Sequence, residues 1–302
     1  MTEMMMTCLR AAAVALALIN VATAQAAPVR ANDDDGRPLA LAQPARRIVS
    51  LAPHTTELLY AIGAGDRILA TVNYADYPEA AKKLPRVGDA HLLDLERIAA
   101  LKPDLIVVWM HGSAAQQIER LRALGLPVFH SESHRFEDVA DGMRRLGMLT
   151  GTSATAQAAA ADYERDLATL RRTYSGRAPV RVFYQVWHEP LLSFNDRHLV
   201  SDAIRLCGGV NVFGSLPALV PTVSVEAVLA AKPDLVATTE RMGTQSEDGL
   251  DRWRSLKHFE PGAKGRFVIV HTDLISRQTP RILQGTKLLC EGFDRVRQEL
   301  RR

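Results

Sequence analysis

A helix-then-strand unit occurs twice in this chain, and this repeat constrains the fold more than any other feature of the sequence. Residues 95–108 read LERIAALKPDLIVV, and residues 225–238 read VEAVLAAKPDLVAT. In each copy, apolar residues at helical spacing end at Lys-Pro-Asp, and a short apolar run follows. Helices that alternate with buried strands are typical of parallel α/β sheets. The repeat therefore predicts two similar α/β lobes, each built of three layers.

Short β-rich runs and one long helical segment complete the predicted organisation. A length of 302 residues suggests about two domains. We expect further strands at residues 47–51, 68–72, 128–129, 180–184 and 267–270. Residues 152–175 are rich in good helix formers, and Gly176 and Pro179 follow them. This segment is either an ordinary packing helix or, as we favour, a stiff backbone between the lobes. The predicted boundaries are a first lobe at 27–151, a linking helix at 152–176 and a second lobe at 177–302, with 27–45 a loose or edge-strand leader.

The first 26 residues have the anatomy of a secretory signal peptide. Arg10 precedes the apolar run AAAVALALINVA, and Ala24-Gln25-Ala26 is a small-x-small cleavage site. We expect cleavage after Ala26, with Ala24 as the near alternative. No later stretch of roughly 18 apolar residues follows. The mature protein is therefore predicted to be exported and soluble, without a membrane span.

Removal of the leader leaves two cysteines, Cys207 and Cys290. An even pair in an oxidising compartment favours a disulfide, and two buried free thiols are the alternative.

Composition and motifs exclude several function classes. The net charge is +3, with both signs spread along the chain and no basic patch with interleaved aromatics, so we expect no nucleic-acid partner. The chain has no G-x-S-x-G elbow, no P-loop and no G-x-G-x-x-G that opens a helix after a strand. We therefore expect no catalysis and no catalytic cofactor.

Aromatic and histidine side chains follow the predicted strands, where ligands bind in open α/β sheets. Trp109 and Trp187 fall at such ends, one in each half of the chain. Aromatic faces there suit a large, partly flat, amphipathic ligand, although they can also cap the edge of a core. The histidines near these ends are His54, His91, His111, His188 and His271. Each is a possible metal ligand, but no tight H-x-H or H-E-x-x-H spacing occurs.

Six stretches carry a resemblance to a known family. They are RIVSLAPHTTELLYAIG, NYADYPEAAKKLPRVG, LDLERIAALKPDLIVVW, LCGGVNVF, PTVSVEAVLAAKPDLV and TPRILQGTKLLCE. Together they resemble the periplasmic substrate-binding proteins of cobalamin, haem and ferric-siderophore ABC importers, the helical-backbone (class III) binding proteins, and among these the cobalamin-binding members. The resemblance covers residues 46–300.

The resemblance implies roles for particular residues. The positions that match corrinoid-contacting positions of the family are Pro53, His54, Tyr74, Trp109, Asp273 and Arg277. Cys207 and Cys290 match a disulfide of the second lobe. Glu96 and Glu226, one in each copy of the repeat, match paired glutamates that dock on arginines of the permease. The alternative for both glutamates is that each favours the positive N-terminus of its helix.

The sequence also departs from the family pattern. Ala90 and Val220 stand where cobalamin receptors have tryptophans, and Trp187 compensates from the second lobe. The resemblance implies a monomeric periplasmic receptor that captures cobalamin and delivers it to an ABC permease. One alternative is haem or a ferric siderophore, held with the help of His54, His91, Tyr74 or Tyr77. Others are an extracytoplasmic metalloenzyme that uses cleft histidines and a receptor-derived sensory module.

Overall fold

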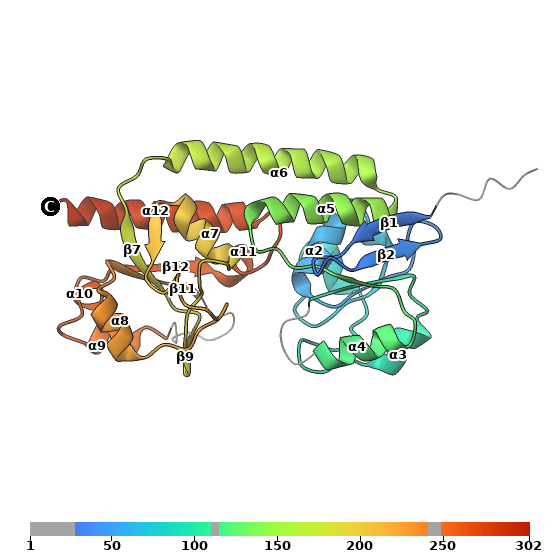
Figure 1. Cartoon of the computed structure of the whole chain (residues 1–302), viewed down its shortest axis with the longest axis horizontal. Coiled ribbons are helices and arrows are strands. Elements are labelled where there is room, and N and C mark those ends of the chain that lie inside the picture. Colours follow the sequence, from blue (N-terminus) through green and yellow to red (C-terminus); the bar gives the residue numbers. More distant parts are fainter. Residues whose placement is uncertain (1–27, 110–114, 241–248) are drawn as a thin grey trace, which may run out of the picture.

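The structure is a computed structural model that describes residues 28–109, 115–240 and 249–302. The predicted signal peptide therefore lies outside the described residues, and so does His111. Figure 1 shows two lobes side by side under a long helix.

In the described part of the first lobe there are six strands and the helices that connect them. Its elements are β1 Val29–Asn32, β2 Pro38–Leu41, β3 Ile48–Ser50, α2 Pro53–Ala61, β4 Ile68–Ala70, α3 Leu95–Ala100, β5 Leu105–Val108, α4 Ala115–Ala123, β6 Val128–His130 and α5 Phe136–Thr150. Short 3₁₀ turns lie at Gly65–Arg67 and Glu79–Lys83. The helix α6, Ser153–Tyr174, follows.

The second lobe repeats this alternation. Its elements are β7 Val180–Tyr184, β8 Trp187–His188, β9 Leu191–Leu192, α7 Leu199–Leu206, β10 Gly209–Asn211, α8 Val225–Ala231, β11 Leu235–Glu240, α9 Asp251–Ser255, α10 Glu260–Ala263, β12 Phe267–His271, α11 Thr272–Ile275 and α12 Ile282–Leu300.

Each lobe holds a four-stranded sheet with the same strand order. The order is β4-β3-β5-β6 in the first lobe and β10-β7-β11-β12 in the second, and every neighbouring pair is parallel. In both sheets the first strand along the chain is central, and the second lies at the edge beside it. The prediction of two similar parallel α/β lobes is therefore confirmed, and each predicted strand is present.

Two hairpins lie outside these sheets. β1 and β2 pair antiparallel where a loose or edge-strand leader was expected. Their apolar residues alternate, so that Leu41 is buried in the core while Val29 and Ala31 pack against it. β8 and β9 form a second hairpin with two residues in each strand, at the predicted strand end that carries Trp187.

The long helix α6 lies along both lobes (Figure 1). It has 22 residues, which lie within the predicted segment 152–175, and it packs on α5 of the first lobe and on α12 of the second. Among the residues that the structure describes, no helix combines the length and the apolar character that a membrane crossing requires.

Three apolar clusters make each lobe a three-layer structure. One continuous cluster runs along the spine side of both sheets and includes Phe136, Tyr163 and Phe293. A second fills the space between the first sheet and α3 and α4, and a third lies between the second sheet and α8 to α10 around Trp253. The parallel strands are thus covered on both faces, which explains their continuous apolar runs.

The repeated Lys-Pro-Asp segment is a corner with the same geometry in both lobes. Lys102 and Lys232 both have a φ of 46°. Asp104 accepts hydrogen bonds from the backbone nitrogens of Arg46 and Arg47, and Asp234 accepts one from that of Arg181. The arginines return the contact, because Arg47 Nε donates to the Lys102 carbonyl and Arg181 Nε donates to the Lys232 carbonyl. Each corner therefore ties the end of a helix to the start of the central strand.

The second lobe carries the disulfide. Cys207, directly after α7, and Cys290, within α12, are joined with a Cα–Cα distance of 4.7 Å. The predicted disulfide is therefore present.

Candidate functional site

Two of the predicted ligand contacts meet at the strand ends of the first lobe. His54, the second residue of α2, lies 5.8 Å from Trp109 between ring centroids, with an interplanar angle of 89°. His54 is 6% exposed, and its Nε2 lies 3.4 Å from the Ser131 carbonyl oxygen. Burial lowers the pKa of His54 to about 4, so that the imidazole is neutral at pH 7. Pro53 precedes it as the first residue of α2.

Two other predicted contacts, Tyr74 and Asp273, meet the guanidinium of a third, Arg277. Arg277 Nη2 lies 2.9 Å from Asp273 Oδ1 and donates to the Tyr74 carbonyl oxygen at 3.1 Å. Arg277 Nη1 also reaches two carboxylates of the first lobe, Glu57 at 2.6 Å and Asp76 at 2.9 Å. Arg277 as a whole is 9% exposed. The side chains that sequence reasoning assigned to the ligand therefore include one arginine that carboxylates already surround.

Glu57 and Asp76 are functional candidates that sequence reasoning missed. Glu57 is 4% exposed, and burial raises its pKa while the hydrogen bond from Arg277 opposes that shift. A signal was present in HTTELLYA, where one carboxylate interrupts a buried helical pattern. A charge at such a position is costly unless a partner meets it.

The aromatic residue of the second lobe lies on the β8–β9 hairpin. Trp187 is 39% exposed and stacks on His188, with 5.4 Å between ring centroids and an interplanar angle of 29°. Its Nε1 donates to the Glu189 carbonyl oxygen at 2.8 Å. This contact holds the indole against the hairpin and leaves part of it accessible.

The residues suggested for metal binding do not form a cluster in the described part of the chain. His54 is buried beside Trp109, whereas His91 is exposed in the turn between Gly88 and Leu93. Over residues 28–109, 115–240 and 249–302, no group of three or more His, Cys, Asp and Glu side chains has the arrangement of a metal site.

A second buried histidine lies on the same side of the first lobe. His130, at the end of β6, has Nδ1 3.1 Å from Asp35 and Nε2 3.5 Å from Glu132. Burial alone would lower its pKa, but the two carboxylates outweigh this effect and raise the pKa. The run Asp33-Asp34-Asp35, which the sequence placed in a loose leader, thus belongs to the folded lobe.

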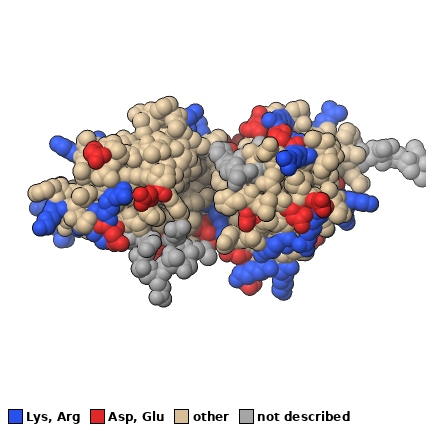
Figure 2. Space-filling model, turned by 90° about the horizontal axis from the view of Figure 1, so that it is seen from below, with Lys and Arg blue, Asp and Glu red and all other residues tan. Residues whose placement is uncertain are grey.

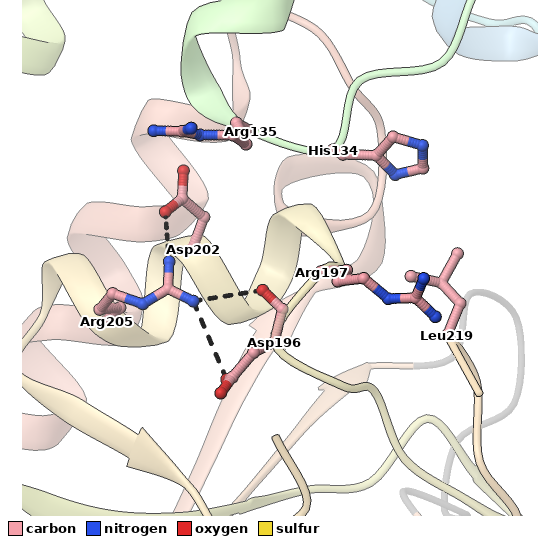
Figure 3. A pocket seen from close by; sticks show the side chains of 7 residues that line it. All are labelled: His134, Arg135, Asp196, Arg197, Asp202, Arg205 and Leu219. Atoms are coloured by element: carbon pink, nitrogen blue, oxygen red, sulfur yellow. Dashed lines mark hydrogen bonds and ion pairs between the residues drawn. The ribbon is translucent and has the colours of Figure 1, made fainter. Parts of the chain in front are cut away.

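A cavity of about 560 Å³ lies between the segment before α5 and the start of α7 (Figure 3). Its lining residues are His134, Arg135, Asp196, Arg197, Asp202, Arg205 and Leu219. Arg205 pairs with Asp202 at 2.7 Å, and Asp202 also accepts from the Phe136 backbone nitrogen at the start of α5. None of the predicted ligand contacts is among the residues that line this cavity.

The two predicted docking glutamates occupy equivalent positions. Glu96 and Glu226 are the second residues of α3 and α8, and both are exposed. The caps match as well, because Asp94 accepts from the Arg97 nitrogen and Ser224 accepts from the Ala227 nitrogen. Figure 1 places α3 and α8 on the side of the two lobes that lies away from α6, and Figure 2 shows acidic and basic side chains on both lobes of the face seen from below.

Sequence comparison matches most of this chain to one family. Residues 48–274 match the sequence model of the periplasmic binding protein family. The Vitamin B12-binding protein of Vibrio parahaemolyticus is 34% identical over 258 residues, which cover 85% of this chain and 92% of the relative. The Vitamin B12-binding protein of Yersinia pestis is 36% identical over 251 residues, which cover 83% and 87%.

Solved structures share the fold over both lobes. The periplasmic Vitamin B12 binding protein BtuF of Vibrio cholerae superimposes with a TM-score of 0.75 at 33% identity and covers 84% of this chain and 98% of its own. The periplasmic heme-binding protein RhuT from Roseiflexus sp. RS-1 has a TM-score of 0.72 at 22% identity, covering 83% and 99%. The second likeness concerns the fold alone.

Proposed function

This chain belongs to the periplasmic binding protein family, and on that premise we propose that it captures cobalamin or a related corrinoid between its lobes and delivers it to an ABC importer. It is a binding protein, as its relatives are, and not an enzyme. The observation that carries the choice of ligand is the 34–36% identity to Vitamin B12-binding proteins across more than four-fifths of the chain. Cleavage of the leader near Ala26 would release the mature receptor as a monomer.

The geometry at the strand ends supports a large amphipathic ligand. Trp109 and His54 form an edge-to-face pair on the first lobe, and Trp187 offers a partly exposed indole on the second. Such aromatic faces suit a macrocycle whose faces are apolar and whose rim carries amides. We assign His54 to the wall of this site, because its Nε2 faces the Ser131 carbonyl oxygen and its imidazole is buried.

Haem is the second candidate, and Tyr74 is the residue that favours it. Tyr74 is 77% exposed and has a backbone φ of 65°. A tyrosine oxygen is an established axial ligand of haem iron. The haem candidate therefore depends on Tyr74, whereas the corrinoid candidate depends on Trp109.

Calorimetric titration of the mature chain with cyanocobalamin, dicyanocobinamide and haemin tests the two candidates. We expect saturable corrinoid binding with a Kd of about 1 µM or tighter. Trp109→Ala should weaken it at least tenfold, about 1.4 kcal/mol. Leu124→Ala is the matched control, because Leu124 is a 64% exposed apolar residue on the same lobe and lies away from the strand ends. Saturation by haemin alone, lost in Tyr74→Phe, would replace cobalamin with haem.

We also propose that Glu96 and Glu226 dock on the permease. Their equivalent positions at the start of α3 and α8 would give a two-fold symmetric partner one carboxylate from each lobe. Carboxylate–arginine contacts can be bidentate and directional.

The test of docking is co-purification of the ligand-loaded receptor with its permease. Glu96→Ala and Glu226→Ala should each weaken the complex without a change in corrinoid affinity. Glu79→Ala is the control, because the Glu79 side chain is 82% exposed and lies outside both helices. Full complex formation by the double variant would contradict the docking role.

A further inference from the structure

The segment between α11 and α12 crosses to the first lobe and makes polar contacts there. Arg277 bonds Glu57 of α2 and the Tyr74 carbonyl oxygen, and Gln278 Oε1 accepts from the Ser133 backbone nitrogen at 2.7 Å. These partners lie 145 to 220 positions away along the chain. Hydrogen bonds from this segment therefore connect the second lobe to the first.

Charged side chains of both lobes form an interlobe ion-pair network here, which consists of Arg277, Arg281, Glu57, Asp76 and Asp273. Arg281 Nε lies 3.7 Å from Glu57 Oε2, and its guanidinium stacks on the Tyr77 ring at 3.9 Å. Glu57 therefore faces both arginines of the second lobe, one with each carboxylate oxygen. It is also the most buried carboxylate of the network, with a side chain 2% exposed against 15% for Asp273 and 32% for Asp76.

The most buried carboxylate should contribute most to holding the two lobes together. A charge pair in a site from which water is excluded is screened less than a pair at the surface, and loss of one partner leaves the other charge uncompensated. Asp76 is exposed enough that water can take the place of its carboxylate beside Arg277. The carboxylate of Glu57 is buried, so its loss leaves both Arg277 and Arg281 without their buried partner.

We infer that Glu57 is a positioning residue of the interlobe site: it holds Arg277 across the lobe interface and so fixes the segment that bears Tyr74 against Asp273 of the other lobe. The Arg277 guanidinium thus bonds to protein groups, and these contacts hold the Tyr74 and Asp273 segments of the site in place. The lobe orientation set by this network does not depend on the ligand. Its effect on affinity rests on the proposed function.

Glu57 can be replaced by glutamine with a loss of charge and little change in volume. A cavity of about 280 Å³ adjoins the network and is lined by residues that include Glu57, Tyr60, Tyr77, Thr279 and Arg281. Within the described part of the chain, Glu57 Oε2 has no hydrogen-bond partner. Glutamine has the size of glutamate, so Glu57→Gln removes the charge without filling or emptying this space.

The first test measures lobe orientation in the ligand-free protein. Nitroxide labels on Leu124→Cys and Lys264→Cys, one exposed position in each lobe, report the interlobe distance distribution by pulsed electron resonance. We expect Glu57→Gln to widen the distribution at least 1.5-fold and Arg277→Gln to do the same. Glu79→Gln, an exposed glutamate of the same lobe, should leave the width unchanged. Folded variants of Glu57 and Arg277 with the width of the unsubstituted protein would overturn the inference.

Hydrogen exchange decides the case in which neither variant folds. In the unsubstituted chain, we expect the amides of residues 276–279 to exchange at least 100-fold more slowly than in an unstructured peptide. Exchange at the unstructured rate would also overturn the inference, because a segment that opens freely cannot set the lobe orientation.

Titration of Glu57→Gln with cyanocobalamin separates this inference from the proposed function. We expect about tenfold weaker binding than in the unsubstituted chain. A wider distance distribution with unchanged affinity would remove the positioning role in ligand binding. Failure of the unsubstituted chain to bind any corrinoid would contradict the proposed ligand. The inference that the network sets the lobe orientation would still stand.

Discussion

The two lobes share a framework and differ in what that framework carries. Both have four parallel strands in the same order, the same Lys-Pro-Asp corner and a glutamate at the second position of the equivalent helix. Burial repeats as well, because residues 101–108 and 231–238 follow the same sequence of half-buried, exposed and buried positions.

The differences lie at the strand ends and in the covalent link. The first lobe buries histidines and carboxylates there, among them His54, Glu57 and His130. The second lobe carries a disulfide and the half-exposed indole of Trp187. The repeated parts thus build the scaffold, whereas the parts that differ are the side chains that we propose for ligand contact and the disulfide of one lobe.

Removal of the disulfide should produce the largest difference between the lobes. It closes a separation of 83 residues, and such links typically contribute about 2–5 kcal/mol. We expect Cys207→Ser with Cys290→Ser to lower the free energy of unfolding by this amount in urea. A reductant should do the same to the unsubstituted protein and nothing to the variant. Equal stability of the oxidised and reduced proteins would contradict a stabilising role.

The two buried histidines of the first lobe should respond to pH in opposite directions. The folded-state pKa of His54 is about 4 against 6.5 for the free side chain, so the unfolded chain binds the extra proton. Stability should therefore fall by up to about 3 kcal/mol as the pH drops from 6.5 to 4. The pKa of His130 is raised, so its contribution is present below pH 6.5 and is lost as the pH rises through its folded-state pKa.

Melting temperature against pH for two variants checks this assignment. His54→Gln should flatten the acid limb of the profile, and His130→Gln should flatten the limb above pH 6.5. The opposite assignment, or an unchanged profile in both variants, would show that other groups control the pH dependence.

The repeated corner should be more sensitive in the first lobe than in the second. Asp104 accepts from two backbone nitrogens, while the equivalent Asp234 accepts from that of Arg181. We expect Asp104→Ala to cost about 2 kcal/mol and Asp234→Ala about 1 kcal/mol, measured by urea unfolding. A larger loss for Asp234→Ala than for Asp104→Ala would contradict the predicted order.

The two glutamates proposed to dock on the permease, Glu96 and Glu226, should give the smallest effect on stability. Each carboxylate is exposed and lies in the first turn of its helix, where a negative charge is weakly favourable. Glu96→Ala and Glu226→Ala should therefore lower the free energy of unfolding by similar, small amounts. A loss above about 1.5 kcal/mol for either one would show a structural role that obscures the docking test.

Much of the fold could be predicted because it depends on local patterns. The long helix 152–175, the strands after each Lys-Pro-Asp and the paired cysteines all leave signals in apolar spacing, helix propensity or residue count. For residues 27–45 the prediction left a loose and an edge-strand leader open and did not include the pairing of β1 with β2. Four-residue strands in a polar segment give only a short alternation, and the packing of this hairpin depends on α5.

The site was predicted less completely, for a related reason. The sequence alone determined two repeated lobes, a joining helix and the residues that follow each strand, because periodicity and turn chemistry act over a few residues. Only the tertiary structure decided that Arg277 meets Glu57 and Asp76 across the lobe interface and that His54 is buried against Trp109. Such contacts join residues up to 220 positions apart, and the charge or burial of a side chain depends on neighbours that no local pattern encodes.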